Sequence, residues 1–276
     1  MKIAVVGLGI IGGSMAMAIK KYTSHYVIGI NRTQSTLEKA LECGAIDEIG
    51  DENSISNADL IILGLYPALA VDFIKRNCDK IKKGAVVTDT SGIKSTVCPE
   101  LERIAAQGDF TFIGSHPMAG KETNGFSSAD PDLFEGASFI VVPGQAPFPA
   151  VDTLCRLALA IGFKGVRFTT PEEHDRMIAY TSQLPHVLAC AYVLSPQCPN
   201  HKGFSAGSYR DVSRVAKINA KLWSELFIEN REPLTKEIDT LIDNLKLIKT
   251  EIENKNTDRL INILDKSRKI KEQLDE

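Results

Sequence analysis

The sequence KIAVVGLGIIGGS, residues 2–14, decides the fold of this chain. After Lys2, residues 3–6 form an apolar run rich in β-branched side chains, as in a buried strand, and Gly7, Gly9 and Gly12 follow. Apolar residues then continue with helical spacing over Met15–Ile19. Gly7 permits a tight turn, Gly9 lets the backbone approach a pyrophosphate, and Gly12 allows the helix to pack closely on the strand. The order of strand, glycine turn and helix therefore predicts a dinucleotide-binding loop.

The start of this helix offers free backbone N–H groups to phosphates, so Ile10 and Ile11 join the glycines as predicted cofactor contacts. After the next apolar run, the chain carries no carboxylate where one would bind the ribose hydroxyls of NAD. Asn31 can hydrogen-bond a ribose oxygen instead, and Arg32 with Thr33 could bind a 2′-phosphate. This charge pattern favours NADP, or a relaxed choice of NAD(P), over strict NAD. The alternative for Arg32 is an exposed loop arginine with no ligand.

The amino-terminal half alternates short β-branched runs with helical patterns, which is typical of successive βαβ units. Several runs are apolar on both faces, as expected for a mostly parallel sheet covered by helices on each side. The predicted fold class is therefore α/β, a Rossmann-type doubly wound sheet. Its predicted strands are Lys2–Val6, Tyr26–Ile30, Leu60–Leu63, Ala85–Thr88, Thr111–Gly114, Phe139–Val142 and Gly165–Phe168, with crossover helices over Thr36–Leu41, Ala68–Cys78 and Ser95–Ala106.

The pattern changes at Thr170, which can cap a helix that has Pro171 in its first position and Glu173 close behind. From there almost every segment is helical in pattern, so we predict two domains, residues 1–169 and an all-α domain over 170–276. One long helix carries an apolar stripe that could pack on its own domain or form a dimer seam. The stripe consists of Leu234, Ile238, Leu241, Leu245, Ile248 and Ile252.

The composition excludes several classes of function. A net charge of −3 without any run of lysine or arginine disfavours nucleic acid and anionic membranes as partners, so a small molecule is the better default. The six cysteines contain no Cys-x-x-Cys pair, which argues against a metal site and against a disulfide framework. Met1 leads directly into the first strand, and no apolar run reaches the roughly 18 residues of a membrane helix. We therefore expect a cytoplasmic protein.

A second informative stretch places His116 at the end of a predicted strand, in the sequence Gly114-Ser115-His116-Pro117-Met118. A histidine there can meet a bound nicotinamide and accept a proton, because its unperturbed pKa lies close to working pH. A histidine before proline after a strand is also typical of a turn residue with satisfied hydrogen bonds. The residues alone leave both interpretations open.

Further motifs follow in order along the chain. They are Leu65-Tyr66-Pro67, Asp89-Thr90-Ser91-Gly92-Ile93-Lys94, His116-Pro117-Met118-Ala119-Gly120, Ser182-Gln183-Leu184-Pro185-His186 and Tyr209-Arg210-Asp211-Val212-Ser213-Arg214. Together with the glycine loop, this ordered set resembles the prephenate/arogenate dehydrogenase family over most of the chain. The resemblance implies oxidative decarboxylation of prephenate to 4-hydroxyphenylpyruvate, or of arogenate to tyrosine, in tyrosine biosynthesis. It also implies a Rossmann domain followed by a helical domain that binds substrate and forms a homodimer.

The resemblance also implies roles for individual residues. His116 matches the catalytic histidine, and Arg214 matches an arginine that binds a substrate carboxylate through its planar fork. Trp223 matches an aromatic residue near the active site across the dimer, although a plain core position is the alternative. The other matched positions are His186, Arg210, Ser182 and Gly207 in the substrate pocket, Leu65 and Lys94 near the cofactor, and Glu122 and Asp211 as an acidic gate.

One departure from the family concerns the serine that supports the catalytic histidine. The family usually has Asp-x-Gly-Ser-x-Lys, whereas this chain has Ser91 followed by Gly92, so the serine is displaced by one position. Ser91 could still reach His116 if the turn differs, or Thr90 could take its place.

Three alternatives stay open at this point. An arogenate-specific enzyme would differ only in one or two pocket residues that meet an amino acid side chain instead of a keto acid. A β-hydroxyacid or imine reductase shares the glycine loop and a helical dimer domain, but it would leave the combination of His116 with Arg214 unexplained. A nucleotide-sensing protein without catalysis would need the loop but not His116, His186 and Arg214 together.

Overall fold

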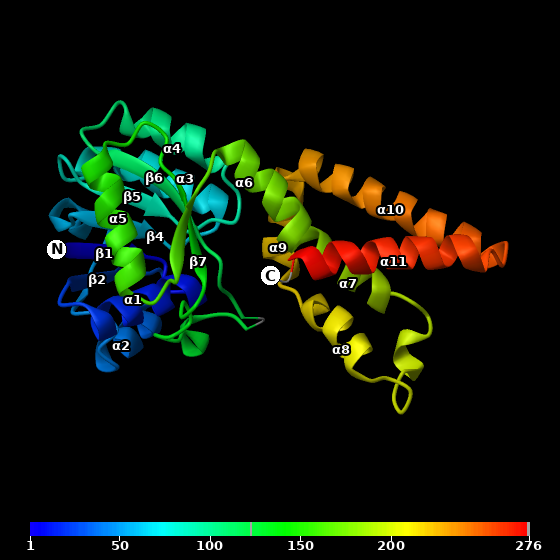
Figure 1. Ribbon diagram of the computed structural model, residues 1–276. Coiled ribbons are helices and arrows are strands. Elements are labelled where there is room, and N and C mark those ends of the chain that lie inside the picture. Colours follow the sequence, from blue (N-terminus) through cyan, green and yellow to red (C-terminus); the bar gives the residue numbers. More distant parts are fainter. Residues whose placement is uncertain (122, 275–276) are drawn as a thin grey trace.

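The computed structural model describes residues 1–121 and 123–274, and an eight-stranded sheet forms its amino-terminal half (Figure 1). The strand order is β3-β2-β1-β4-β5-β6-β7-β8, and all neighbours are parallel except the antiparallel pair β6 and β7. This arrangement confirms the predicted α/β fold class. The strands are β1 (Lys2–Val6), β2 (Tyr26–Ile30), β3 (Glu48–Ile49), β4 (Leu60–Leu63), β5 (Val86–Asp89), β6 (Thr111–Pro117), β7 (Ser138–Val142) and β8 (Gly165–Phe168).

Helices cover both faces of the sheet and bury two separate apolar clusters. Side chains alternate along β1, so Ile3 and Val5 belong to one cluster while Ala4 and Val6 belong to the other. The first cluster is closed by α1 (Ile10–Tyr22), α2 (Gln34–Glu42) and α5 (Phe148–Ala160), and the second by α3 (Pro67–Asn77) and α4 (Val97–Ala105). Burial on both faces explains why the central strands are continuous apolar runs.

Two details of the sheet differ from the sequence prediction. Strand β3 was not predicted, because its two residues, Glu48–Ile49, are too short to show any alternation. Strand β6 continues to Pro117, so His116 lies within the strand and pairs with Ile140 of β7. The backbone of His116 is therefore held by its pairing with β7 and does not lie in a turn.

The chain from Pro171 onward is helical and extends away from the sheet (Figure 1). Thr170 accepts a 3.2 Å hydrogen bond from the Glu173 backbone N–H, which confirms the predicted cap. The helices are α6 (Pro171–Ile178), α7 (Leu184–Val193), α8 (Gly207–Ser213), α9 (Ala220–Glu229), α10 (Arg231–Glu253) and α11 (Thr257–Leu274). A π-helical turn, Ala179–Gln183, joins α6 to α7, whose second residue, Pro185, cannot donate an intrahelical bond.

The apolar stripe of α10 is only partly covered within one chain. Leu234 at its start is buried, whereas Leu245 and Ile252 are 52% and 58% exposed. Helix α11 packs beside α10 and carries exposed leucine and isoleucine of its own, including Leu264 and Ile270. No described helix is long and apolar enough to cross a membrane. Within the described ranges, no cluster of histidine, cysteine and acidic side chains is placed to hold a metal ion.

Candidate active site

The glycine loop has the geometry that a diphosphate requires. Gly7 has a φ of +90°, and a side chain there would approach the Gly64 carbonyl oxygen to 2.6 Å. A Cβ on Gly12 would lie 2.0 Å from the Gly7 carbonyl oxygen, so only glycine lets α1 begin this close to β1. At Gly9, the N-cap of α1, an added Cβ would meet no described atom within 4 Å, and no described side chain caps the helix. This open space beside free N–H groups fits the phosphates of a dinucleotide.

The residues predicted to bind the adenosine ribose lie at the end of β2. Asn31 Oδ1 accepts a 3.1 Å hydrogen bond from the Leu8 backbone N–H, so Asn31 braces the glycine loop. Arg32 and Thr33 follow it and are exposed, with Thr33 as the N-cap residue of α2. Leu65 lies against the other side of the loop, because its Cδ2 would be 2.8 Å from a Cβ on Gly7. The loop is therefore flanked by the predicted cofactor residues from β2 and β4.

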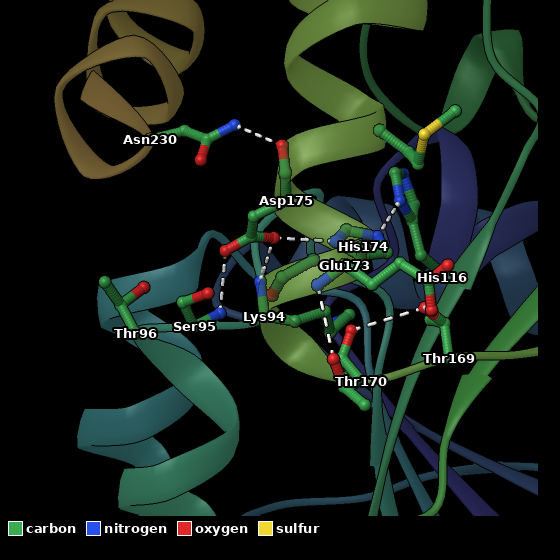
Figure 2. Close-up of polar contacts among 12 residues, drawn as sticks. Lys94, Ser95, Thr96, His116, Thr169, Thr170, Glu173, His174, Asp175 and Asn230 are labelled. Atoms are coloured by element: carbon green, nitrogen blue, oxygen red, sulfur yellow. Dashed lines mark hydrogen bonds and ion pairs between the residues drawn. The ribbon is translucent and has the colours of Figure 1, made fainter. Parts of the chain in front are cut away.

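His116 belongs to a chain of three polar side chains that joins the two domains. Its Nδ1 lies 2.9 Å from Nε2 of His174, and Nδ1 of His174 lies 2.7 Å from Oδ1 of Asp175. Figure 2 shows the three side chains in line, with His116 from the sheet and the other two from α6. His174 and Asp175 are buried, while His116 is partly exposed. The ring of His116 is thus held from behind and remains open on one side.

Asp175 is fixed by further hydrogen bonds from both domains. Its carboxylate accepts the backbone N–H groups of Lys94 at 2.9 Å and Ser95 at 2.8 Å, just before α4 begins. Its carbonyl oxygen accepts a 2.9 Å bond from the side-chain amide of Asn230. Figure 2 shows Asp175 between these partners. The carboxylate is therefore restrained at both oxygens.

The surroundings set the charge of each of the three hydrogen-bonded side chains, His116, His174 and Asp175. Burial, together with His174 and Lys94, holds the pKa of His116 well below its usual value. Burial also lowers the pKa of His174, although its hydrogen bond to Asp175 acts in the opposite direction. Burial alone would raise the pKa of Asp175, but hydrogen bonds from His174 and the backbone of Ser95 bring it below the usual range. At neutral pH both imidazoles are therefore neutral and Asp175 is ionised.

Two residues of the turn after β5 differ from their predicted roles. Lys94 was predicted to contact the cofactor, but its side chain has no exposed surface and pairs with the equally buried Asp89. Ser91 was predicted to support His116, but among the described residues its hydroxyl has no hydrogen-bond partner. The Thr90 hydroxyl, the other possibility, donates to the Leu63 carbonyl oxygen at 3.2 Å. The support of His116 comes from His174 instead.

The predicted substrate residues of the helical domain gather around α7 and α9. The rings of His186 and Trp223 stack within one chain, with centroids 3.7 Å apart. Nδ1 of His186 lies 2.8 Å from the Ser182 carbonyl oxygen, so this nitrogen carries the proton. Arg214 begins a 3₁₀ turn, Arg214–Ala216, that packs against α7. Four of the predicted pocket residues therefore lie on adjoining segments: Ser182, His186, Arg214 and Trp223.

Helix α9 connects this group to His116. A Cβ built on Gly92 would lie 3.6 Å from Leu226 Cδ2 and 3.8 Å from both Cε1 and Nε2 of His116. Leu226 is three residues beyond Trp223 on α9, and the two lie on the same side of that helix. The free edge of the His116 ring therefore faces the turn at Gly92 and the helix that carries Trp223.

The remaining predicted residues lie on α8 or outside the described chain. Gly207 begins α8, and Arg210 and Asp211 are exposed on it. Glu122, the other predicted gate residue, lies outside the described residues. His174 and Asp175 belong to the site but to none of the motifs quoted above. The sequence feature that indicates them is a histidine directly followed by an aspartate, at the start of the helix that follows the last strand.

Comparisons with known proteins agree with this architecture. The family model described as prephenate dehydrogenase, nucleotide-binding domain, matches residues 15–166, and the model described as its dimerization domain matches residues 170–266. A prephenate dehydrogenase of Bacillus subtilis is 29% identical over 94% of this chain and 72% of its own length. A cyclohexadienyl dehydrogenase of Zymomonas mobilis is 29% identical over 97% of this chain and 94% of its own.

Solved structures show the same likeness in three dimensions. The arogenate dehydrogenase of Synechocystis has a TM-score of 0.85 at 28% identity, covering 99% of this chain and 100% of its own. The prephenate dehydrogenase of Aquifex aeolicus, in complex with hydroxyphenyl propionate and NAD⁺, has a TM-score of 0.88 at 25% identity, covering 99% and 98%. With both domains matched in order, the chain belongs to the prephenate dehydrogenase family of NAD-dependent oxidoreductases.

Proposed function

We propose that this enzyme oxidises prephenate to 4-hydroxyphenylpyruvate with loss of carbon dioxide, in tyrosine biosynthesis. The observation that carries the proposal is the setting of His116. Its Nδ1 is occupied by His174, and its Nε2 faces the turn at Gly92. The side chain is neutral at working pH, as a hydrogen-bond acceptor must be.

The substrate presents two groups that the site must meet. One ring carbon carries a hydroxyl and a hydrogen, and the opposite ring carbon carries the carboxylate that is lost. A bound nicotinamide would supply the acceptor for this hydrogen as hydride. Nε2 of His116 accepts a hydrogen bond from the hydroxyl as positive charge develops on its carbon. Loss of the carboxylate as carbon dioxide returns electrons to the ring, the hydroxyl becomes the phenol of the product, and no net proton leaves the site.

Residues of the helical domain complete the proposed pocket. Arg214 would bind a carboxylate through its guanidinium, and Arg210 would add positive charge for a dianion. The stacked rings of His186 and Trp223 would form an amphipathic wall beside the substrate ring. Ser182 would lie at the pocket edge, and Gly207 would place backbone near the substrate. Leu65 and the glycine loop would position the nicotinamide against His116.

Arogenate is the second candidate substrate. The likeness to the Synechocystis arogenate dehydrogenase over the full length of both chains supports it. Arogenate carries an amino acid side chain where prephenate carries a keto acid, while the reacting ring is the same. The chemistry at His116 would therefore be unchanged.

We further propose that NADP is the preferred cofactor. The segment after β2 has Asn31, whose oxygen is already used by the Leu8 N–H, and no carboxylate to repel a 2′-phosphate. Arg32 and Thr33 are exposed beside it. We also propose a division into domains at residues 169/170 and a cytoplasmic location. We propose a homodimer through α10 and α11, because several of their leucine and isoleucine side chains are about half exposed.

A single experiment tests the reaction and the cofactor. Reduction of nicotinamide is followed by absorbance with prephenate or arogenate, each crossed with NAD and NADP, for native protein and for His116→Asn. We expect turnover of prephenate with NADP, at least about 100-fold slower in the variant. Arg32→Ala should raise KM for NADP about tenfold and leave KM for NAD unchanged, with Arg156→Ala as an exposed control on α5. Absence of turnover in a folded, nucleotide-binding protein would refute the proposed reaction.

A further inference from the structure

We propose that His174 and Asp175 are positioning residues that fix His116 in the tautomer with a proton on Nδ1 and a bare Nε2. The proposal deepens the function given above and rests on it for its catalytic meaning. The two residues touch neither the substrate carbon nor the nicotinamide in this scheme. They act through the His116 ring.

The proton positions follow from the donors and acceptors in the chain. Oδ1 of Asp175 already accepts the Lys94 backbone N–H, and an ionised carboxylate has only lone pairs to offer. Nδ1 of His174 must therefore donate in its 2.7 Å contact with Asp175. A neutral imidazole has one proton, so Nε2 of His174 is left as an acceptor. In the 2.9 Å contact between the rings, His116 must donate from Nδ1, which leaves its Nε2 without a proton.

His174 and Asp175 are held rigidly enough to impose this tautomer on His116. His174 and Asp175 are each 2% exposed, so water does not compete for their hydrogen bonds. The second carboxylate oxygen of Asp175 accepts the Ser95 N–H at 2.8 Å. Asn230 holds the Asp175 carbonyl and also donates to Oε1 of Gln183 at 2.7 Å, which anchors α6 to the start of α10. The orientation of the carboxylate is thus set by both domains before substrate arrives.

No other described side chain hydrogen-bonds to the ring of His116 in place of His174. The turn after β5 presents Gly92 to the Nε2 edge of His116, and glycine has no hydroxyl to donate there. Ser91 has no hydrogen-bond partner among the described residues, and Thr90 is bonded to a backbone carbonyl. Lys94 and Asp89 form a buried ion pair with each other. The Nε2 side is therefore left to the substrate.

The direct test is the tautomer of His116 in the whole protein. The protein is labelled with ¹⁵N-histidine, and long-range proton–nitrogen correlation at neutral pH separates protonated from bare ring nitrogens. The chain has five histidines, and the signals of His116 are those that disappear in His116→Asn. We expect a protonated Nδ1 and a bare Nε2 in native protein. A protonated Nε2 would overturn the proposal. Since no substrate is present, this result does not depend on whether the proposed reaction is correct.

The kinetic test compares variants of His174 that keep or remove the hydrogen-bond acceptor for Nδ1 of His116. His174→Gln retains an oxygen that can accept from His116, whereas His174→Leu does not. We expect kcat of His174→Leu to fall about 10- to 100-fold with KM within about threefold, and His174→Gln to recover kcat to within about threefold of native. In His174→Leu, the His116 signals should show a mixture of tautomers.

A matched control is His201→Leu. Among the described residues, the His201 ring hydrogen-bonds to Ser205 and stacks on Tyr209 of α8. Its kcat should stay within about twofold of native. The proposal is overturned if His174→Leu keeps native kcat, or if His174→Gln loses as much kcat as His174→Leu while both remain folded by circular dichroism. If His174→Leu does not fold, His174→Gln and the native tautomer still decide the question.

Discussion

Replacing Lys94 by methionine should destabilise the sheet domain by about 3 kcal/mol. Lys94 and Asp89 form an ion pair in which neither side chain has any exposed surface. Removing one partner of a buried pair costs about 3–5 kcal/mol, because the other charge stays buried. Asp89 would keep two backbone donors, Ser91 N–H at 3.0 Å and Ser115 N–H at 3.1 Å, which places the expected cost at the lower end.

The assay is thermal and urea unfolding, followed by circular dichroism. For the domain that contains the pair, about 3 kcal/mol corresponds to a Tm lower by about 6–12 °C. Lys83→Met is the control, since Lys83 pairs with Asp109 while their side chains are 83% and 71% exposed, and its effect should be below about 1 kcal/mol. Adding Asp89→Asn to Lys94→Met should cost less than the sum of the single changes. If Lys94→Met unfolds within about 1 kcal/mol of native protein, the reasoning from the buried pair is refuted.

Three further predictions concern the glycine loop, the start of α6 and the pH dependence. Gly12→Ala should lower the free energy of unfolding by about 3 kcal/mol or prevent folding, because the added Cβ would lie 2.0 Å from the Gly7 carbonyl oxygen. Gly9→Ala should fold normally, and fluorescence titration should show that it binds nucleotide about tenfold more weakly. Thr170→Ala should lower the free energy of unfolding by about 1 kcal/mol in urea, and no change would contradict the observed cap. The lowered pKa of His116 places the acid limb of kcat/KM below pH 6.5, and a midpoint above 6.5 would contradict it.

The same pKa shift has a consequence for stability, with a sign that can be worked out. The unfolded chain binds a proton at His116 near pH 6.5, while the folded chain binds one only at lower pH. Between these two values the unfolded state holds more protons, so the free energy of unfolding falls as pH falls below about 6.5. Urea midpoints of His116→Asn should show a smaller loss over the same pH range than those of native protein.

The sequence was sufficient for the sheet and for the glycine loop because both depend on local patterns. Apolar runs such as Leu60–Leu63 are buried on both faces, and a strand followed by spaced glycines has few structural alternatives. Thr170 could be identified as a cap because the capping bond spans three residues. Strand β3 escaped prediction because two residues carry no periodicity.

The support of His116 could not be predicted in the same way. His116 and His174 are far apart in sequence, and they meet only because α6 folds back on the carboxyl edge of the sheet. The family motif places a serine near Asp89, so a hydroxyl was expected beside His116. Among the described residues the Ser91 hydroxyl has no hydrogen-bond partner, and Lys94 is buried against Asp89; neither result depends on a pattern that is local in sequence.

The antiparallel pairing of β6 with β7 has a consequence for how this enzyme can vary. His116 pairs with Ile140, and the Met118 N–H donates to the Ser138 carbonyl oxygen at 2.9 Å. The segment that connects β6 to β7 therefore begins and ends at strand residues that are bonded to each other. Its two ends are fastened together independently of its length. Changes within that segment that keep the fully buried Phe134 in the core can therefore leave the backbone of His116 paired to β7.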